Sequence, residues 1–300
     1  MKKSQGGALI IAILAVALVT SSAVWLLRSQ TLWVKQNETL LALSQGKQFL
    51  LAGLDWARII LAEDARHSSI DHAAELWAKP LPPSSSEGWE ITGAIEDAQS
   101  RFNLNNLQIN GKASPGDIAL FAALLRHTQS PPELATALVE WLDSETREGA
   151  EDTAYLALKP PYRSANQALD ELADLAKIRG FTPQIIARLM PYITVLPSRT
   201  TINLNTTSAA LLMTFIPGLT SGEAQQMISR RNHTPFQSLA DAKGTLPRLE
   251  LQIPEGVFSL GSNYFRVVGR ATSEGRQIGL EALISREVRL KPKIIWKREI

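Results

Sequence analysis

The chain has 300 residues, 45% of them hydrophobic and 20% charged, with no cysteine and a formal net charge of +2. The absence of cysteine excludes a disulfide scaffold, a thiolate zinc site and a cysteine nucleophile, and the four scattered histidines argue against a histidine-rich metal centre. The near-zero charge argues against broad electrostatic binding of nucleic acid, the apolar content excludes a disordered chain, and the length indicates about two domains.

The first element is an uncharged apolar run from Ala8 to Leu27. A helix of that length spans about 30 Å, which matches the hydrocarbon core of a bilayer. Only a short segment containing Lys2 and Lys3 precedes it. The positive-inside rule therefore predicts a cytoplasmic N-terminus and a body on the far side of the membrane.

Three interpretations of this run compete. It fits a secretory signal peptide cut after Ala23, a plain membrane anchor, or a prepilin leader that ends in glycine and whose apolar helix is retained. From Arg28 to Arg66 there is no proline, and apolar residues recur at helical spacing. This continuity favours the prepilin interpretation, because a released secretory protein does not need it.

The remaining elements follow from periodicity and from proline and glycine breaks. We expect a Pro- and Ser-rich break at 79–88, strands at 89–96 and 101–104, and a helical block at 117–143 that Pro131-Pro132 divides. Two short helices at 166–177 and 182–190, a helix–turn–helix at 202–242 and a hairpin at 257–288, with its turn at Ser273-Glu274-Gly275, complete the order. Because strands flank the helices on both sides, the simplest fold is an α+β domain with a helical domain inserted in its sheet.

The segment from Asn203 to Leu239 resembles the helix–hairpin–helix family. Asn203, Asn205 and Thr206 precede the first helix, where short polar side chains can cap free amides. The hairpin turn consists of Pro217, Gly218, Leu219 and Thr220, and its glycine permits a backbone conformation that other residues resist. In DNA-binding members of that family, the hairpin amides hold a phosphate.

The charge of this segment is too small for a DNA contact. Between residues 199 and 243 there are two acidic residues, Glu223 and Asp241, and four basic ones. The basic residues are Arg199, Arg230, Arg231 and Lys243. A phosphate contact usually needs several cations, because counterion release supplies most of the affinity. The sequence therefore favours a structural hairpin over a DNA-binding one.

Five carboxylates gather around Gly149: Asp143, Glu145, Glu148, Glu151 and Asp152. Calcium takes six to eight oxygen ligands, often from acidic loops in which a glycine permits the turn. The spacing is not that of an EF-hand, and Arg147 works against a bound cation. A solvated acidic loop at the end of a helix is the alternative.

Several short motifs, taken in order, resemble the minor pseudopilin K family of type II secretion systems, the general secretion pathway protein K family. They are Gly6-Gly7-Ala8-Leu9-Ile10, Arg101-Phe102-Asn103-Leu104-Asn105, Trp141-Leu142-Asp143-Ser144-Glu145, Gly149-Ala150-Glu151-Asp152 with Tyr155, Pro160-Pro161-Tyr162-Arg163-Ser164-Ala165-Asn166, and the hairpin segment 202–241. Each motif is weak alone, but their order over most of the chain is specific.

The resemblance implies a pilin-like α+β fold, with a long N-terminal helix and an antiparallel sheet. A large all-helical domain containing helix–hairpin–helix-like subdomains is inserted in it. The expected divisions are a leader at 1–6, a transmembrane and assembly helix at 7–27, a spine helix with the first strands at 28–104, the inserted domain at 105–255 and the C-terminal strands at 256–300. The resemblance also implies a structural Ca²⁺ in the helical domain, which favours calcium at the acidic cluster.

Processing by prepilin peptidase is a further implication of the resemblance. Cleavage after Gly6 would leave Gly7 to be methylated, and cleavage after Gly7, leaving Ala8, is the alternative. Residue five of the mature chain is then Ile11 or Ala12, where most pilin-like subunits carry a glutamate that pairs with a neighbour's N-terminal amine. A subunit without this glutamate can occupy the first place in a filament.

We therefore expect a non-enzymatic minor pseudopilin, anchored in the inner membrane by one helix with its body in the periplasm. It would sit at the pseudopilus tip above pseudopilins I and J, nucleate or cap assembly, and support export of folded proteins across the outer membrane. Secreted substrates and the outer-membrane secretin are further candidate partners.

Two other classes remain as alternatives. One is a membrane-anchored helix–hairpin–helix DNA-binding protein of the competence type, although such proteins usually end with the hairpin and lack strands like those at 257–288. The other is a periplasmic enzyme released by signal-peptide cleavage. The sequence has no G-x-S-x-G, phosphate-loop or H-E-x-x-H motif, which leaves catalysis without support.

Overall fold

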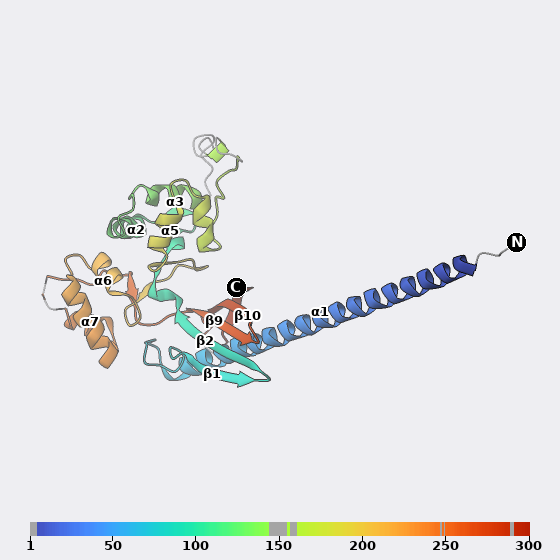
Figure 1. Ribbon diagram of the computed structural model, residues 1–300. Coiled ribbons are helices and arrows are strands. Elements are labelled where there is room, and N and C mark those ends of the chain that lie inside the picture. The colour runs from blue at the N-terminus through green and yellow to red at the C-terminus, as the bar shows by residue number, and fades with distance from the viewer. Residues whose placement is uncertain (1–4, 144–154, 157–160, 247, 249, 289–290) are drawn as a thin grey trace.

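The longest element of the structure, a computed structural model that describes residues 5–143, 155–156, 161–246, 248, 250–288 and 291–300, is helix α1. This helix, Gln5–His67, has 63 residues. Its N-terminal half projects alone, whereas its C-terminal half lies against the body of the protein (Figure 1). The continuous helix predicted from the absence of proline is therefore confirmed.

The C-terminal half of α1 packs on a five-stranded antiparallel sheet. The strand order is β1 (Leu81–Ser86), β2 (Trp89–Asp97), β9 (Tyr264–Ser273), β10 (Arg276–Ser285) and β11 (Lys293–Glu299). Leu50, Leu54 and Leu61 recur at helical spacing and are buried against Phe265 and Ile284 of the sheet. Burial of each leucine contributes about 2 kcal/mol, so this contact fixes the helix to the sheet.

Strands β9 and β10 form the C-terminal hairpin that the alternating pattern predicts. The inward-facing residues of one strand lie opposite those of the other, as in the pairs Ile284–Phe265 and Ala282–Val267. The two turn residues both have positive φ, 47° at Glu274 and 78° at Gly275. A two-residue hairpin turn requires this conformation, and glycine adopts it without strain.

The segment 79–88, predicted to be a break without regular structure, contains strand β1. This strand contains Pro82 and Pro83 and lies at the edge of the sheet, where it pairs only with β2. An edge strand makes ladder hydrogen bonds on one side only, so it tolerates proline. The register shifts between Leu81 and Ser84, where the prolines lie.

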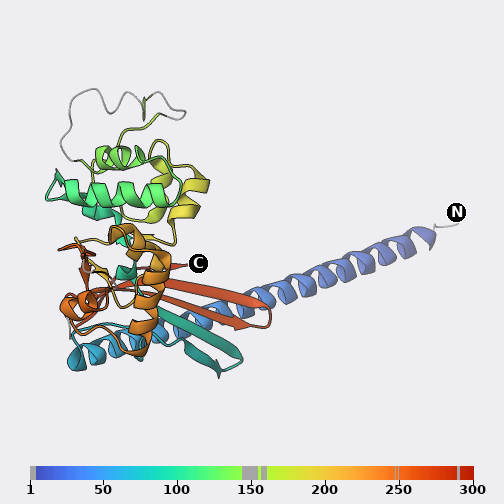
Figure 2. The same cartoon turned by 90° about the vertical axis from the view of Figure 1, so that its left-hand side faces the viewer.

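The inserted domain lies between β2 and β9 in sequence and at the end of α1 remote from the N-terminus (Figure 2). Its elements are η1 (Ala98–Ser100), β3 (Phe102–Asn103), η2 (Leu104–Leu107), β4 (Gln108–Ile109), β5 (Lys112–Ala113), α2 (Pro115–His127), α3 (Leu134–Leu142), η3 (Leu172–Lys177), α5 (Pro183–Leu189), β6 (Ile193–Thr194), β7 (Ile202–Asn203), α6 (Ala209–Phe215), α7 (Ser221–His233), α8 (Leu239–Gly244) and β8 (Phe258–Ser259). A separate apolar core holds them together, in which the ring of Phe102 lies 6.1 Å from Phe121 and 5.6 Å from Phe215.

The limits of the inserted domain differ from the predicted 105–255. Phe102 is buried in the core of this domain, so the domain begins before residue 105. Phe258 in β8 pairs in parallel with Ile202 of β7 and belongs to the same core, so β8 is not one of the C-terminal strands of the sheet. A strand pair of two residues leaves no alternation in the sequence, which is why the pattern did not reveal it.

Candidate functional site

The first part of α1 exposes apolar side chains on every side. The span Gly7–His67 contains an apolar window with a mean hydropathy of 2.5, and none of that window is buried inside the protein. Leu9, Ile11 and Leu18 are 65%, 69% and 72% exposed. A helix that is apolar all round needs an apolar environment such as lipid or other helices. This part of α1 therefore fits a single-pass membrane anchor.

The predicted processing residues lie at the start of this helix. Gly6, Gly7 and Ala8 fall in the first turn of α1, and nothing lies within 4 Å of the position that a Cβ on Gly7 would take. Both candidates for mature residue five, Ile11 and Ala12, lie one turn further along. Cleavage and methylation at this site stay predictions.

Apolar exposure continues beyond Arg28, where the uncharged run ends. The exposed large residues of this stretch are Leu32, Trp33, Val34, Leu40 and Leu41. Contiguous exposed apolar surface on a part of the chain outside lipid marks an interaction site. The middle of α1 is therefore a candidate surface for helix–helix assembly.

Asp97, the last residue of β2, joins the sheet to the inserted domain. Its carboxylate accepts hydrogen bonds from Asn203 Nδ2 at 2.9 Å, Thr206 Oγ1 at 2.6 Å and Ser262 Oγ at 2.7 Å. The backbone N–H of Gln99 also donates to it, at 2.8 Å. Burial raises the pKa of Asp97, and the hydrogen bonds from Thr206, Ser262 and Gln99 partly offset the increase. The carboxylate thus holds segments more than a hundred residues apart in one rigid junction.

Arg286 holds a second part of the same junction from the end of β10. Its guanidinium donates to Asp64 Oδ2 at 2.7 Å, to the carboxylate of Asp71, and to the Ser262 carbonyl at 3.0 Å. The same group lies 4.6 Å from the ring centre of Phe265. Because this side chain is only 5% exposed, it depends on these partners for its charge balance.

Glu75 adds a third carboxylate to this junction. Asp64, Asp71 and Glu75 each place one carboxylate oxygen within 4.8 Å of the others. The backbone N–H of His72 and the indole N–H of Trp77 donate to Glu75, at 2.9 and 2.7 Å. Burial nevertheless raises the pKa of Glu75 to about 7. One arginine therefore faces three carboxylates, one of which titrates near neutrality.

The raised pKa of Glu75 predicts a pH dependence of stability. Between its ordinary value near 4.5 and about 7, the folded chain holds a proton that the unfolded chain has lost, so the free energy of unfolding falls as the pH rises. Glu75→Gln should remove this loss and stabilise the chain at pH 8 by on the order of 2 kcal/mol, with little effect at pH 4.5.

The measurement is the urea midpoint of the detergent-solubilised chain and its variant at both pH values. Burial lowers the pKa of His72, which titrates in the opposite sense. Because His72 Nε2 lies 3.5 Å from Glu75 Oε1, the two groups are not independent, and the difference between variant and parent is therefore measured also in a His72→Gln background. A difference that is the same at pH 4.5 and pH 8 would contradict the proposed titration of Glu75.

Helices α6 and α7 form the predicted hairpin, and two amides of its turn, those of Leu219 and Thr220, are bonded within the fold. Gly218 has φ of +83°, as the turn requires, and the N–H of Leu219 donates to the Ile216 carbonyl at 3.1 Å. The N–H of Thr220 donates to Glu223 Oε2 at 2.8 Å, which closes a capping box. A carboxylate therefore occupies the position at the start of α7 where a phosphate would bind.

Arg248 fixes this arrangement from outside the predicted motif. Its Nε donates to Glu223 Oε1 at 2.9 Å, and its Nη2 donates to the Gly218 carbonyl. The hydrogen bond from Arg248, with those from Thr220, lowers the pKa of Glu223 to about 2. The hairpin is thus closed by an internal ion pair.

Three of the four basic residues of the segment are also engaged within the fold. Arg231 is buried and donates to the carbonyls of Leu204 and Thr207. Arg230 donates to the Thr234 carbonyl at 2.6 Å, and Arg199 pairs with Asp117 at 3.2 Å. The geometry therefore favours the structural interpretation of the hairpin.

The residues predicted to cap the first helix of the hairpin do not cap it. The N-cap of α6 is Ser208, whose side chain accepts from the N–H of Leu211. Asn203 and Thr206 instead bond to Asp97 in the junction, and Asn205 donates to the Phe236 carbonyl at 3.1 Å. Polar residues shortly before a helix predict a cap but do not show which of them provides it.

Only Asp143 of the five predicted calcium ligands lies within the described part of the chain, where it is the C-cap of α3. Glu145, Glu148, Glu151 and Asp152 lie outside the described residues. The segment is flanked by an aromatic cluster in which the Trp141 ring lies 5.6 Å from Tyr155 and 6.4 Å from Tyr162. Calcium binding by this segment stays a prediction.

Sequence reasoning missed the roles of Asp97, Arg286 and Arg248. Most of their partners lie far away in sequence, such as Glu223 at 25 residues from Arg248, Asn203 at 106 from Asp97 and Asp64 at 222 from Arg286. The only local signal was the position of Asp97 and Arg286 at the ends of their strands. Side chains at the ends of strands lie at the border of the sheet, where they can contact the neighbouring segments.

Comparison with known proteins assigns the chain to a family. Two sequence models described as type II secretion system protein K match residues 100–198 and 202–259. Type II secretion system protein K of Pseudomonas aeruginosa is 29% identical over 95% of the chain and 90% of the relative, and that of Pectobacterium carotovorum is 30% identical over 88% and 87%. Protein K of Klebsiella pneumoniae is 32% identical over 79% of the chain and 78% of the relative.

A solved structure shares the fold. The GspK–GspI–GspJ complex from the type 2 secretion system of enterotoxigenic Escherichia coli contains a chain that superimposes with a TM-score of 0.77. The match covers 88% of this chain and 99% of that one, at 22% sequence identity. The predicted pilin-like α+β fold with its inserted helical domain is thereby confirmed. Together with the family models and the relatives, these findings show that the chain belongs to the type II secretion system protein K family.

Proposed function

We propose that this chain is the minor pseudopilin at the tip of a type II secretion pseudopilus, where it nucleates or caps assembly and supports export of folded proteins. The observation that carries this proposal is the division of the 63-residue helix α1. The first half of this helix is apolar and exposed, and its second half packs against the five-stranded sheet of the folded domain. A subunit built in this way packs through its helix and presents its body at the filament surface.

The place at the tip follows from the bulk of the inserted domain. This domain lies at the end of α1 remote from the N-terminus (Figures 1 and 2), where it would obstruct a further subunit stacked above. The apolar residue at mature position five, Ile11 or Ala12, removes the carboxylate that would pair with a subunit above. Both features suit a subunit that has neighbours only below.

The proposed partners are pseudopilins I and J, because the solved relative forms a complex with GspI and GspJ. Helix α1 would also contact other pseudopilins, prepilin peptidase and the inner membrane. The secreted substrate or the secretin would contact the inserted domain. Lys2 and Lys3 before the apolar run support a body in the periplasm. No described feature of the chain calls for a catalytic role.

A structural Ca²⁺ at Asp143, Glu145, Glu148, Glu151 and Asp152 is part of the proposal. The chain has no disulfide, so a cation would stabilise an acidic segment that otherwise repels itself. Calorimetric titration of the chelator-treated chain with Ca²⁺ tests it. Absence of binding heat would remove the ion from the account.

The experiment that tests the function locates the chain on assembled filaments. A tag on the inserted domain is labelled with gold in cells that assemble the pseudopilins of the same secretion system, and sheared filaments are imaged. We expect one label at one end of each filament, and loss of secretion when the chain is deleted. Labels along the shaft would contradict a tip position.

A further inference from the structure

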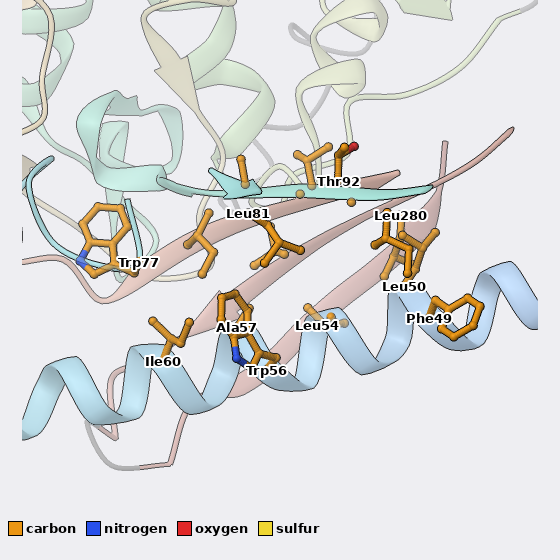
Figure 3. A pocket seen from close by; sticks show the side chains of 18 of the residues that line it. Phe49, Leu50, Leu54, Trp56, Ala57, Ile60, Trp77, Leu81, Thr92 and Leu280 are labelled. Atoms are coloured by element: carbon orange, nitrogen blue, oxygen red, sulfur yellow. The ribbon is translucent and has the colours of Figure 1, made fainter. Parts of the chain in front are cut away.

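An apolar groove runs between α1 and the β1–β2 side of the sheet (Figure 3). Its helix side consists of Phe49, Gly53, Trp56 and Ile60, and its sheet side includes Leu81 and Ile91. The cavity within it measures about 50 Å³. An apolar cavity of about 150 Å³ holds benzene, so this one has room for the end of a single aliphatic side chain.

The opening of the groove is apolar and accessible. Trp56 on α1 and Leu76 in the following loop are 45% and 67% exposed. Gly53, which also lines the groove, contributes no side chain, and nothing lies within 4 Å of the position its Cβ would take. A glycine at this position lets another backbone approach α1 closely, as small residues do where helices pack together.

Exposed apolar residues occur on one side of α1 in two patches, the second of which borders the groove. Val34 and Leu41 are two turns apart on the same side of the helix, and Ile59 follows Leu41 by 18 residues, which is about five turns. Trp56, one turn before Ile59, forms the edge of the groove. These side chains are all largely exposed, at 45% to 71%. Exposed apolar side chains therefore lie on this side of α1 near the membrane segment and again beside the groove, with the polar residues Gln48 and Asp55 between the two patches.

We propose that the groove receives an aliphatic side chain from the N-terminal helix of a second pilin-type subunit. The proposal rests on the proposed function, which supplies neighbours anchored in the same membrane. A neighbour with its own apolar N-terminal helix leaves the bilayer alongside α1 and runs parallel to it. Gly53 lies 26 residues beyond Leu27, about 39 Å along the helix, a height that the neighbour's helix reaches if it is built on the same plan.

Two substitutions at Gly53 test this proposal against a matched control. Gly53→Ala and Gly53→Leu both replace a glycine inside a helix, so both should favour the helical conformation of α1 to a similar extent. Only leucine fills the groove. The full chain is co-expressed with tagged pseudopilins I and J of the same system, solubilised in detergent, and the amount retained on each partner is quantified.

We expect Gly53→Ala to be retained like the unmodified chain and Gly53→Leu to lose retention at least about tenfold, as expected when one buried aliphatic side chain is displaced. Thermal unfolding of each variant shows whether it is folded. If Gly53→Leu is not folded, Leu76→Ser at the groove edge, with the exposed Leu239→Ser on the inserted domain as control, makes the same comparison.

Equal retention of both Gly53 variants, or equal loss, would overturn the groove as the binding site. Failure of the unmodified chain to retain either partner would instead count against the proposed function on which the groove proposal rests. If Gly53→Leu released only one of the two pseudopilins, that protein would be identified as the occupant.

Discussion

Replacing Arg286 by alanine is expected to destabilise the chain by about 3–5 kcal/mol, because it leaves buried carboxylates without their cation. Arg286 is bonded to both Asp64 and Asp71, and Glu75 lies within reach of the same oxygens. Arg286 lowers the pKa of Asp64 against the effect of burial, so without the guanidinium the pKa of that carboxyl group should rise further. The folded variant would then bind protons, and its deficit relative to the parent should shrink as the pH falls from 8 to 5.

Urea midpoints of the detergent-solubilised chain at both pH values measure this effect. Arg286→Lys keeps the charge but loses the two-armed contact with the carboxylates, so an intermediate loss is expected. Arg276→Ala is the control, since Arg276 pairs with the exposed Glu274 at 3.2 Å and such pairs contribute little. A deficit below about 1 kcal/mol, or one that does not vary with pH, would show that the arginine does not hold the junction.

Replacing Asp97 by alanine is expected to lower the free energy of unfolding by about 3 kcal/mol. Four donors, from Gln99 in η1, from Asn203 and Thr206 around the end of β7, and from Ser262 just before β9, would lose their acceptor in a buried site. The inserted domain and the sheet have separate cores, so both should stay folded while the junction between them loosens. The variant should therefore become sensitive to protease near residues 98–101 and 260–263.

Limited proteolysis followed by mass spectrometry measures where the chain is first cut. Asp55→Ala is the matched control, because Asp55 is an exposed carboxylate that pairs with Arg58 within α1. If Asp97→Ala were cut at the same sites and rates as the control, the two domains would be held together by other contacts. Unfolding of both domains in one step would also show that they are not separable units.

Features encoded in neighbouring residues could be predicted from the sequence. Helix α1 followed from an apolar run that continues without proline, and the β9–β10 hairpin followed from alternation around Glu274 and Gly275. The α6–α7 hairpin followed from the position of Gly218. In each case a local pattern of period 3.6 or 2, or one turn residue, determines the structure.

Features that depend on distant partners could not be predicted. The short parallel pairs β3–β6 and β7–β8 carry no periodicity, so the limits of the inserted domain came out wrong by several residues. Strand β1 was missed because its prolines are typical of a break, and only its place at the sheet edge makes them tolerable. In the sequence, Asp97 has the features of an ordinary turn residue. Its role in the junction depends on Asn203 and Ser262, which only the fold brings beside it.

The charge balance of the hairpin illustrates the same limit. The count of basic residues in the segment, which favours a structural hairpin over a DNA-binding one, treats Arg231 as a free cation. In the fold Arg231 is buried on two backbone carbonyls, and Arg248, outside the counted segment, neutralises Glu223. A substitution of Arg231 would therefore disturb the packing of α7 and could not serve as a clean test for nucleic-acid binding.

The most direct test of the account is the intact mass of the mature chain purified from membranes of cells that contain its prepilin peptidase. We expect the mature chain to begin at Gly7, or at Ala8, to carry one N-terminal methyl group and to retain the apolar helix. A mature chain that begins at Val24, recovered without the membrane, would contradict the account, because α1 would then have lost the segment through which the subunit is anchored and assembled.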